Sequence, residues 1–138
     1  MSDVTSTVRS LRVAKVAIAN VATAPYGRAA KQALEKLGVW TEVQPKLVVG
    51  ENITQTTQFV ETGNADAGLV ALSVVVSPKL KGKGRWVEVP GDLYSPLEQG
   101  AVITARGAKN PVAPRYLEFL HSPAARKILE DFGYRLPQ

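Results

Sequence analysis

Apolar residues gather in short segments that polar turns separate. Leu11–Asn20 reads LRVAKVAIAN and contains three β-branched residues. The run ends in a polar turn and predicts a buried strand, because β-branched side chains pack well in sheets. After a loop that contains Pro25, Tyr26–Leu37 places apolar side chains at helical spacing, and Gly38 is a typical stop signal. A strand, a short loop and a helix in this order predict the opening of an α/β unit.

A second helix between two further strands follows. Lys46–Val49 (KLVV) predicts a short strand, and Asn52 is a good N-cap residue for a helix that Gly63 ends. Ala65–Leu72 (ADAGLVAL) predicts a third strand, whose small residues permit close packing. The first half of the chain therefore reads β-α-β-α-β, without an internal repeat.

The second half has weaker patterns. Lys79–Arg85 is a loop rich in Gly and Lys, and Trp86–Val89 and Gly100–Ala105 predict strands. An apolar stripe runs from residue 112 to residue 132 and is broken at Ser122-Pro123, which predicts two successive helices.

Composition narrows the chemistry. The 138 residues are 45% hydrophobic and 21% charged, which predicts a packed core. The chain has no cysteine and one histidine, His121, which excludes disulfides, thiolate chemistry and zinc sites that need several imidazoles. No apolar run approaches the length of a membrane helix. Lys and Arg number 17 against 12 for Asp and Glu, and a net charge of +5 favours anionic partners.

Other polar residues offer few signs of chemistry. Lys79, Lys81, Lys83 and Arg85 could follow a nucleic-acid backbone while Trp86 and Tyr94 stack on bases, but a solvated, lysine-rich hairpin is the favoured interpretation. His121 fits the end of a helix better than a catalytic base. The candidate acids and bases, which turns and solvated faces explain equally well, are Asp66, Asp92, Glu98, Glu130 and Asp131. Phosphate-loop and nucleophile-elbow motifs are absent, so neither an enzyme nor a cofactor is predicted.

Several segments together resemble the molybdate-binding periplasmic proteins of ABC uptake systems. The segments are IAN, APYGRAAKQALEKLGVW, KLVVGENITQTTQFVETGNADAGLVALS and AVITARGAKNPVAPRYLEFLHSPAARKILEDFGYRLP. They follow the family's order and cover nearly everything after residue 11. The resemblance implies the type II periplasmic-binding-protein fold, an α/β class in which two lobes with mixed, helix-flanked sheets close on an oxyanion. It also implies molybdate or tungstate as ligand, a membrane component of an ABC transporter as partner and a periplasmic location. Because this sequence shows no signal peptide, a cytoplasmic location of the chain as given is the alternative.

The sequence departs from the family in one large respect. The family's first-lobe segment, with its serine ligands, has no counterpart here, so we expect a truncated member. The expected parts are a polar N-terminal end (1–10), an α/β lobe resembling the family's second lobe (11–99), and a crossover strand with C-terminal helices that normally complete the first lobe (100–138). Ala71 matches a position that carries a tyrosine ligand in some relatives, and alanine cannot supply that hydroxyl. We therefore expect weakened anion binding and a homo-oligomer. The alternatives are an oligomerising module that has lost its ligand or, less favoured, a nucleic-acid-binding domain.

The candidate site lies at two helix starts. A tetrahedral dianion offers only acceptor oxygens, and helix N-termini supply unpaired N–H groups and a favourable dipole. Pro25 would fix the first turn of one helix, and Gly27 would remove bulk so that the amide and hydroxyl of Tyr26 approach a ligand. Asn52 would cap the other helix and leave the amide of Ile53 as a donor. The resemblance implies that the positions of Tyr26 and Ile53 contribute to the anion site. We predict that both helix starts share one edge of a parallel sheet and face a common crevice.

Overall fold

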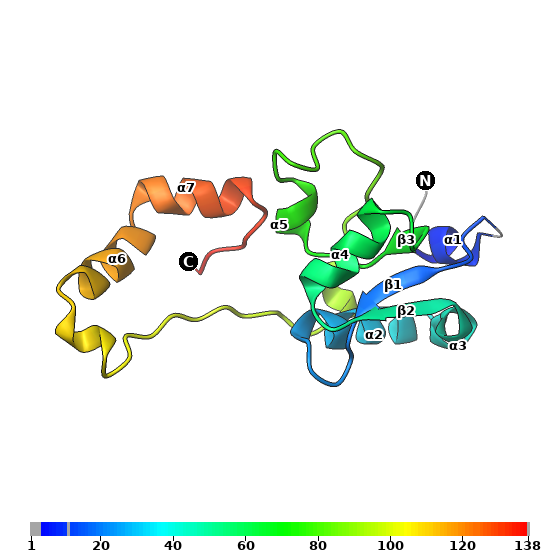
Figure 1. Ribbon diagram of the computed structural model, residues 1–138, viewed down its shortest axis with the longest axis horizontal. Coiled ribbons are helices and arrows are strands. Elements are labelled where there is room, and N and C mark those ends of the chain that lie inside the picture. Colours follow the sequence, from blue (N-terminus) through cyan, green and yellow to red (C-terminus); the bar gives the residue numbers. More distant parts are fainter. Residues whose placement is uncertain (1–3, 11, 138) are drawn as a thin grey trace. The chain divides into compact units, whose positions relative to one another are not determined.

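The computed structural model describes residues 4–10 and 12–137. The helices and strands are α1 (Val4–Arg9), β1 (Val16–Ala19), α2 (Pro25–Lys36), α3 (Trp40–Val43), β2 (Leu47–Gly50), α4 (Ile53–Glu61), β3 (Ala67–Gly68), α5 (Leu72–Val75), α6 (Val112–Leu120) and α7 (Pro123–Asp131). Short 3-10 turns lie at Gln44–Lys46 (η1), Gly91–Leu93 (η2) and Gly107–Lys109 (η3). The chain forms two compact units (Figure 1). The N-terminal unit comprises residues up to Ala71 together with Gly82–Leu97, and the C-terminal unit comprises Leu72–Lys81 and the residues from Glu98 onward.

The N-terminal unit is built on a three-stranded parallel sheet in the order β2-β1-β3. Central β1 is entirely buried, which explains its unbroken apolar sequence VAIA. The connections β1–α2–β2 and β2–α4–β3 cross the sheet in opposite directions. Because such crossovers are right-handed, α2 and α4 cover opposite faces of the sheet, below and above it in Figure 1. The expected α/β fold with a helix-flanked sheet is confirmed, and each pairing among the described strands is parallel rather than mixed.

The main core of this unit lies between β1 and the helices α1, α2 and α3. Its buried members are Val8, Val16, Leu34, Val39 and Val43. Val8 belongs to α1, in the segment for which the sequence predicted only a polar end, and its side chain is 3% exposed. One apolar residue per turn is therefore enough to dock this short, otherwise polar helix on the core.

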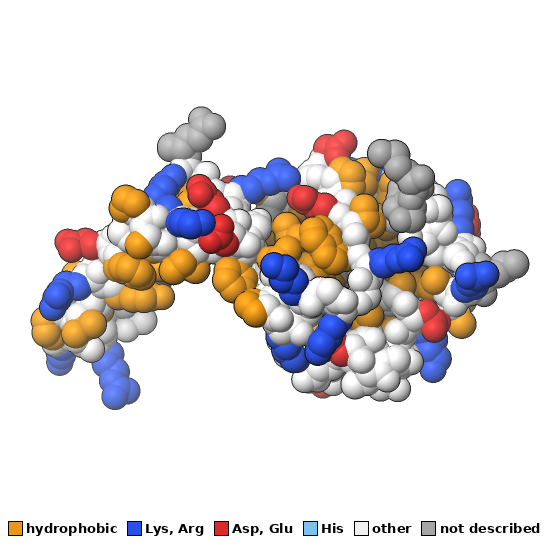
Figure 2. All heavy atoms as spheres, turned by 90° about the horizontal axis from the view of Figure 1, so that it is seen from above, with side chains coloured by type: hydrophobic (Ala, Val, Ile, Leu, Met, Phe, Trp, Pro, Cys, Tyr) orange, Lys and Arg blue, Asp and Glu red, His pale blue; other side chains and the backbone are white. Residues whose placement is uncertain are grey.

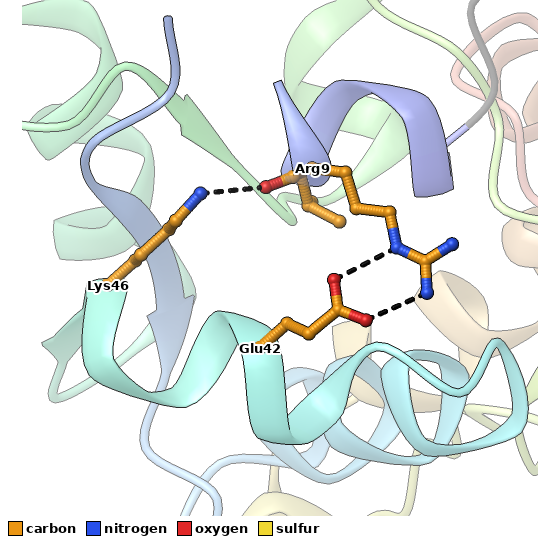
Figure 3. Close-up of polar contacts among 4 residues, drawn as sticks. Arg9, Glu42 and Lys46 are labelled. Carbon is orange, nitrogen blue, oxygen red and sulfur yellow. Dashed lines mark hydrogen bonds and ion pairs between the residues drawn. The ribbon is translucent and has the colours of Figure 1, made fainter. Parts of the chain in front are cut away.

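Polar contacts hold α1 in place beside this core (Figure 3). The guanidinium of Arg9 donates two hydrogen bonds to the carboxylate of Glu42 in α3, at 2.9 and 2.8 Å. The ammonium of Lys46 donates to the carbonyl oxygen of Val8 at 3.2 Å. The hydrogen bond from Arg9 holds the pKa of Glu42 below its usual value. Helix α1 is thus tied to α3 and η1 by side chains about 35 residues away in sequence.

The C-terminal unit has far less core. No residue of α6 is buried, and α7 buries only Ala125. Gly133, just after α7, packs against Leu72 of α5, because a Cβ at Gly133 would lie 2.6 Å from the Cδ2 atom of Leu72. Gly133 also has a φ of +81°, which favours glycine. Hydrophobic side chains are gathered on the surface of the part that holds α6 and α7 (Figure 2). The two predicted C-terminal helices are confirmed, with the break between them at Ser122-Pro123.

Two predicted strands are wrong and two are too long. Within Leu11–Asn20 only Val16–Ala19 is a strand, and Leu11 lies outside the described residues. Trp86–Val89 and Gly100–Ala105 form no strand, and within Ala65–Leu72 only Ala67–Gly68 is paired. A strand requires hydrogen bonds to a neighbour, and these segments have β-branched residues without a partner strand among the described residues. Trp86 and Val87 are 55% and 47% exposed, so this segment lies on the surface rather than in a sheet.

Candidate functional site

Two helices begin at the same edge of the parallel sheet. Ala19 ends β1 and Gly50 ends β2, and these two residues are directly paired. Each strand is followed by a short loop and then by a helix, α2 at Pro25 and α4 at Ile53 (Figure 1). The prediction of one common edge is therefore confirmed, and the prediction that both helix starts face a common crevice stays a prediction. Open α/β sheets bind ligands at this carboxyl edge.

The loop between β1 and α2 is organised by Asn20. The side-chain Oδ1 of Asn20 accepts from the backbone N–H of Ala22 at 2.8 Å, and its carbonyl oxygen accepts from Ala24 at 2.9 Å. The N–H of Asn20 donates across to the carbonyl oxygen of Gly50 at 2.7 Å. The first loop is thus tied to the end of the second strand. Asn20 was not among the predicted site residues, although an Asn directly after a strand is a typical turn-former.

The first turn of α2 lies directly on the end of β1. A Cβ at Gly27 would lie 2.3 Å from the carbonyl oxygen of Asn20 and 2.4 Å from that of Ala19. Gly27 is therefore needed for the approach of the helix to the protein's own backbone, a role that the sequence did not predict. The prediction that Gly27 helps Tyr26 to approach a ligand stays a prediction. Pro25 occupies the first helical turn as expected, and Tyr26 beside it is partly buried.

The start of α4 is capped by side chains. Asn52 is the N-cap as predicted, and its Oδ1 accepts from the N–H of Gln55 at 2.9 Å. The Oε1 of Gln55 in turn accepts from the N–H of Glu51 at 2.7 Å. Gln55 was missed, although Asn followed three residues later by Gln is close to the capping-box pattern. Among the described residues, no acceptor binds the backbone N–H groups of Ile53 and Thr54, so these two donors remain available at the helix start.

A family model described as bacterial extracellular solute-binding protein matches residues 2–135. The chain belongs to this family. It is 48% identical over 122 residues to the molybdate-binding protein ModA of Azotobacter vinelandii, which covers 88% of this chain and 48% of the relative. It is 45% identical over 119 residues to the molybdate-binding protein ModA of Rhodobacter capsulatus, which covers 86% of this chain and 46% of the relative.

A solved structure has the same fold as this solute-binding family member. The periplasmic molybdate-binding protein of Azotobacter vinelandii superposes with a TM-score of 0.84 at 32% identity, over 95% of this chain and 58% of that chain. The periplasmic-binding-protein fold expected from the resemblance is confirmed. The chain spans about half the length of the relatives that it matches. In residues 4–10 and 12–137, no helix is long and apolar enough to cross a bilayer.

A shallow groove adjoins the start of α2. It encloses about 240 Å³ and runs between α2 and the returning segment at Ser95. The N–H of Ser95 donates to the Oε1 of Gln32 at 2.9 Å and so fixes that segment on the helix. Arg28 lines this groove with Pro25 and places a cation one residue beyond the first turn. Ala71 is 3% exposed, and the prediction that it makes no ligand contact stays a prediction.

The remaining polar candidates have structural explanations or lie in solvent. Asp66 accepts hydrogen bonds from the N–H groups of Ala14 and Lys15, both at 2.8 Å. These bonds lower the pKa of Asp66. They also fasten the start of β3 to the segment before β1. His121 is the exposed C-cap residue of α6, as its position in the sequence predicted. Asp131 pairs with Lys127 along α7 at 3.0 Å.

Proposed function

We propose that this chain binds a tetrahedral oxyanion, molybdate or tungstate, at the edge where α2 and α4 begin. The observation that carries the proposal is the pair of helix starts after two adjacent parallel strands, with the N–H groups of Ile53 and Thr54 lacking an acceptor among the described residues. Two relatives of this family are named molybdate-binding proteins, which supports molybdate as the ligand. Binding would be reversible and without a chemical step, in an ABC uptake system outside the cytoplasm.

The proposed contacts follow from the chemistry of the ligand. A dianion with four acceptor oxygens is stabilised by N–H donors and by the positive ends of helix dipoles. Ile53 and Tyr26 would contact the anion, while Pro25, Gly27 and Asn52 hold the two helix starts in place. The net charge of +5 favours the approach of an anion. A membrane component of an ABC transporter would receive the bound anion from the closed protein.

The affinity of this chain alone should be low. The chain spans about half the length of its relatives, so donors from the other half are not supplied by these residues. Each hydrogen bond to a charged group contributes about 1.5–3 kcal/mol, and two lost bonds would weaken binding by a factor of at least about 100. A half-site also leaves the anion in contact with water, which weakens the remaining contacts.

Ile53→Pro tests the proposed donor directly. Ile53 is the first residue of α4, a position where proline is tolerated, and Asn52 before it is already extended at φ −147° and ψ 174°. The substitution removes one N–H donor and leaves the helix intact. Calorimetric titration with molybdate should give an affinity about tenfold lower than that of the wild-type chain. Ile53→Ala is the matched control, because it removes the side chain and keeps the N–H. Equal affinities of the proline variant and the wild-type chain would refute the role of this donor.

A second function is favoured by the surface of the C-terminal unit. Val112, Tyr116, Phe119 and Ile128 of α6 and α7 are 60%, 58%, 48% and 53% exposed. Large exposed apolar patches are typical of protein interfaces, and we propose that this face joins copies of the chain. Phe119→Glu should shift the mass measured by sedimentation equilibrium toward that of a monomer. Gln58→Glu, at an exposed site of α4, is the control. A wild-type chain that is monomeric at high concentration would contradict this proposal.

A further inference from the structure

Asn20 lies where the two loops of the proposed site meet. Its backbone N–H donates to the carbonyl oxygen of Gly50 at 2.7 Å, and Gly50 ends β2 two residues before the N-cap of α4. Its own carbonyl oxygen accepts from Ala24, the N-cap of α2, at 2.9 Å. One peptide segment is thus hydrogen-bonded toward both helix starts.

The side chain of Asn20 fixes the conformation of that segment. Its Oδ1 accepts from the N–H of Ala22 at 2.8 Å, which closes a turn over Asn20–Ala22. The carbonyl group of Asn20 lies directly against the first turn of α2. The space between them is so small that a Cβ added to Gly27 would lie only 2.3 Å from the carbonyl oxygen of Asn20. The backbone of Asn20 is therefore held from three sides: by its own side chain, by Gly50 and by the first turn of α2.

We propose that Asn20 is the positioning residue that sets the first helix start against the second. The two helices cover opposite faces of the sheet, so the spacing of their first turns depends on the loops at the sheet edge. When the side-chain acceptor of Asn20 is lost, the turn at Ala22 opens and the bond to Gly50 shifts. The donors at Ile53 then lie at a different distance from α2. This inference rests on the proposed function for its effect on ligand binding, but the geometric coupling itself can be measured without ligand.

Three substitutions at one position separate the possible roles. Asn20→Ala removes the acceptor, Asn20→Ser keeps a hydroxyl that can accept from Ala22, and Asn20→Asp keeps the acceptor and adds a negative charge. Asn64→Ala is the matched control, since the exposed side chain of Asn64 bonds its neighbour Thr62 and no other residue that the structure describes. Each variant of the full chain is titrated with sodium molybdate, and its amide resonances are recorded by NMR with and without the anion.

The expected results differ between a positioning role and a purely structural one. Asn20→Ala should weaken molybdate binding about tenfold, equivalent to about 1.4 kcal/mol, and should shift the amide resonances of Gly50 and Ile53. Asn20→Ser should restore most of the affinity for molybdate and most of the wild-type resonances of Gly50 and Ile53. Asn20→Asp should keep the wild-type resonances and still weaken binding, because its charge repels an anion held nearby. The control variant should change neither measurement.

Failure of this inference and failure of the proposed function give different results. If the wild-type chain binds no molybdate but Asn20→Ala still shifts the resonances of Gly50 and Ile53, the oxyanion function is wrong and the positioning role stands. If Asn20→Ala perturbs only residues 20–24 and leaves the affinity of the folded protein unchanged, the positioning role is overturned. A loss of binding that merely follows a larger unfolded fraction, measured by thermal denaturation, also overturns it.

Discussion

Leu34 of α2 and Phe119 of α6 both lie on amphipathic helices, yet Leu34 is fully buried and Phe119 is 48% exposed. The same contrast holds for the units around them. The N-terminal unit packs its helices on a parallel sheet, whereas no residue of α6 is buried in the C-terminal unit. Helix periodicity therefore identifies an apolar face in both units, but only the first unit contains the surface that covers it. The second unit leaves apolar side chains of α6 and α7 exposed.

The sharpest test of this contrast removes one large apolar side chain from each unit. Leu34→Ala should lower the free energy of unfolding by about 2–5 kcal/mol, because it leaves a cavity in a closely packed core. Phe119→Ala should cost much less in a monomeric chain, since about half of that side chain is already in water. Urea denaturation followed by circular dichroism measures both. Equal losses for the two variants would mean that α6 has a buried contact in solution.

A smaller effect is expected from adding one methyl group to a glycine of each unit. At Gly27 the new Cβ would lie 2.3 Å from the carbonyl oxygen of Asn20, so Gly27→Ala must displace α2 from the end of β1. We expect a loss of about 1–3 kcal/mol in the free energy of unfolding. At Gly100 no atom of the described residues lies within 4 Å of the same position, and Gly100→Ala should be neutral or slightly stabilising. Thermal denaturation of the two variants checks this, and a neutral Gly27→Ala would contradict the close approach.

The same contrast explains how far the sequence predicts the structure. Local signals were sufficient for the helices that start at Pro25 and at Asn52, because proline, caps and apolar spacing act within one or two turns. They also placed both helix starts on one sheet edge. Local signals failed at Gly100–Ala105, because a strand exists only when another strand pairs with it. The sequence of one segment does not show whether such a partner strand is present.

The site was predicted in the same uneven way. Asn52 and its helix start could be identified from capping rules, but the hydrogen bond from Asn20 to Gly50 joins residues 30 apart in sequence and depends on the order of strands in the sheet. The need for a glycine at position 27 could not be predicted either, because the sequence does not reveal which backbone atoms approach it. Ligand contacts of Tyr26 and Ile53 stay predictions.

The helix caps give the next smaller effect. Asn52 and Ser122 each accept a hydrogen bond from the third residue of their helix, at 2.9 and 3.2 Å. Asn52→Ala should lower the free energy of unfolding of the N-terminal unit by about 1 kcal/mol. Ser122→Ala should reduce the helicity of α7 while the cooperative transition of the N-terminal unit stays in place. Amide hydrogen exchange resolves the two units, and an Asn52→Ala effect confined to α4 would show that this helix unfolds independently.

The smallest effect concerns pH and Asp66. The N–H groups of Lys15 and Ala14 donate to its carboxylate and hold the pKa of Asp66 below its usual value, although the side chain is exposed. A carboxyl whose pKa is lower in the folded state stabilises the fold above its unfolded pKa and loses that contribution as the pH falls through its folded pKa. The wild-type chain should therefore be more stable than Asp66→Asn by a constant amount above about pH 5, and this difference should shrink as the pH falls below about 4. Urea denaturation of both chains at a series of pH values across this range measures the difference in the free energy of unfolding. Asp131→Asn is the matched control for the loss of one carboxylate, because Asp131 pairs with Lys127 along its own helix in the C-terminal unit. A difference between the wild-type chain and Asp66→Asn that persists undiminished in strong acid would mean that the asparagine disturbs the segment before β1 by its shape rather than by its missing charge.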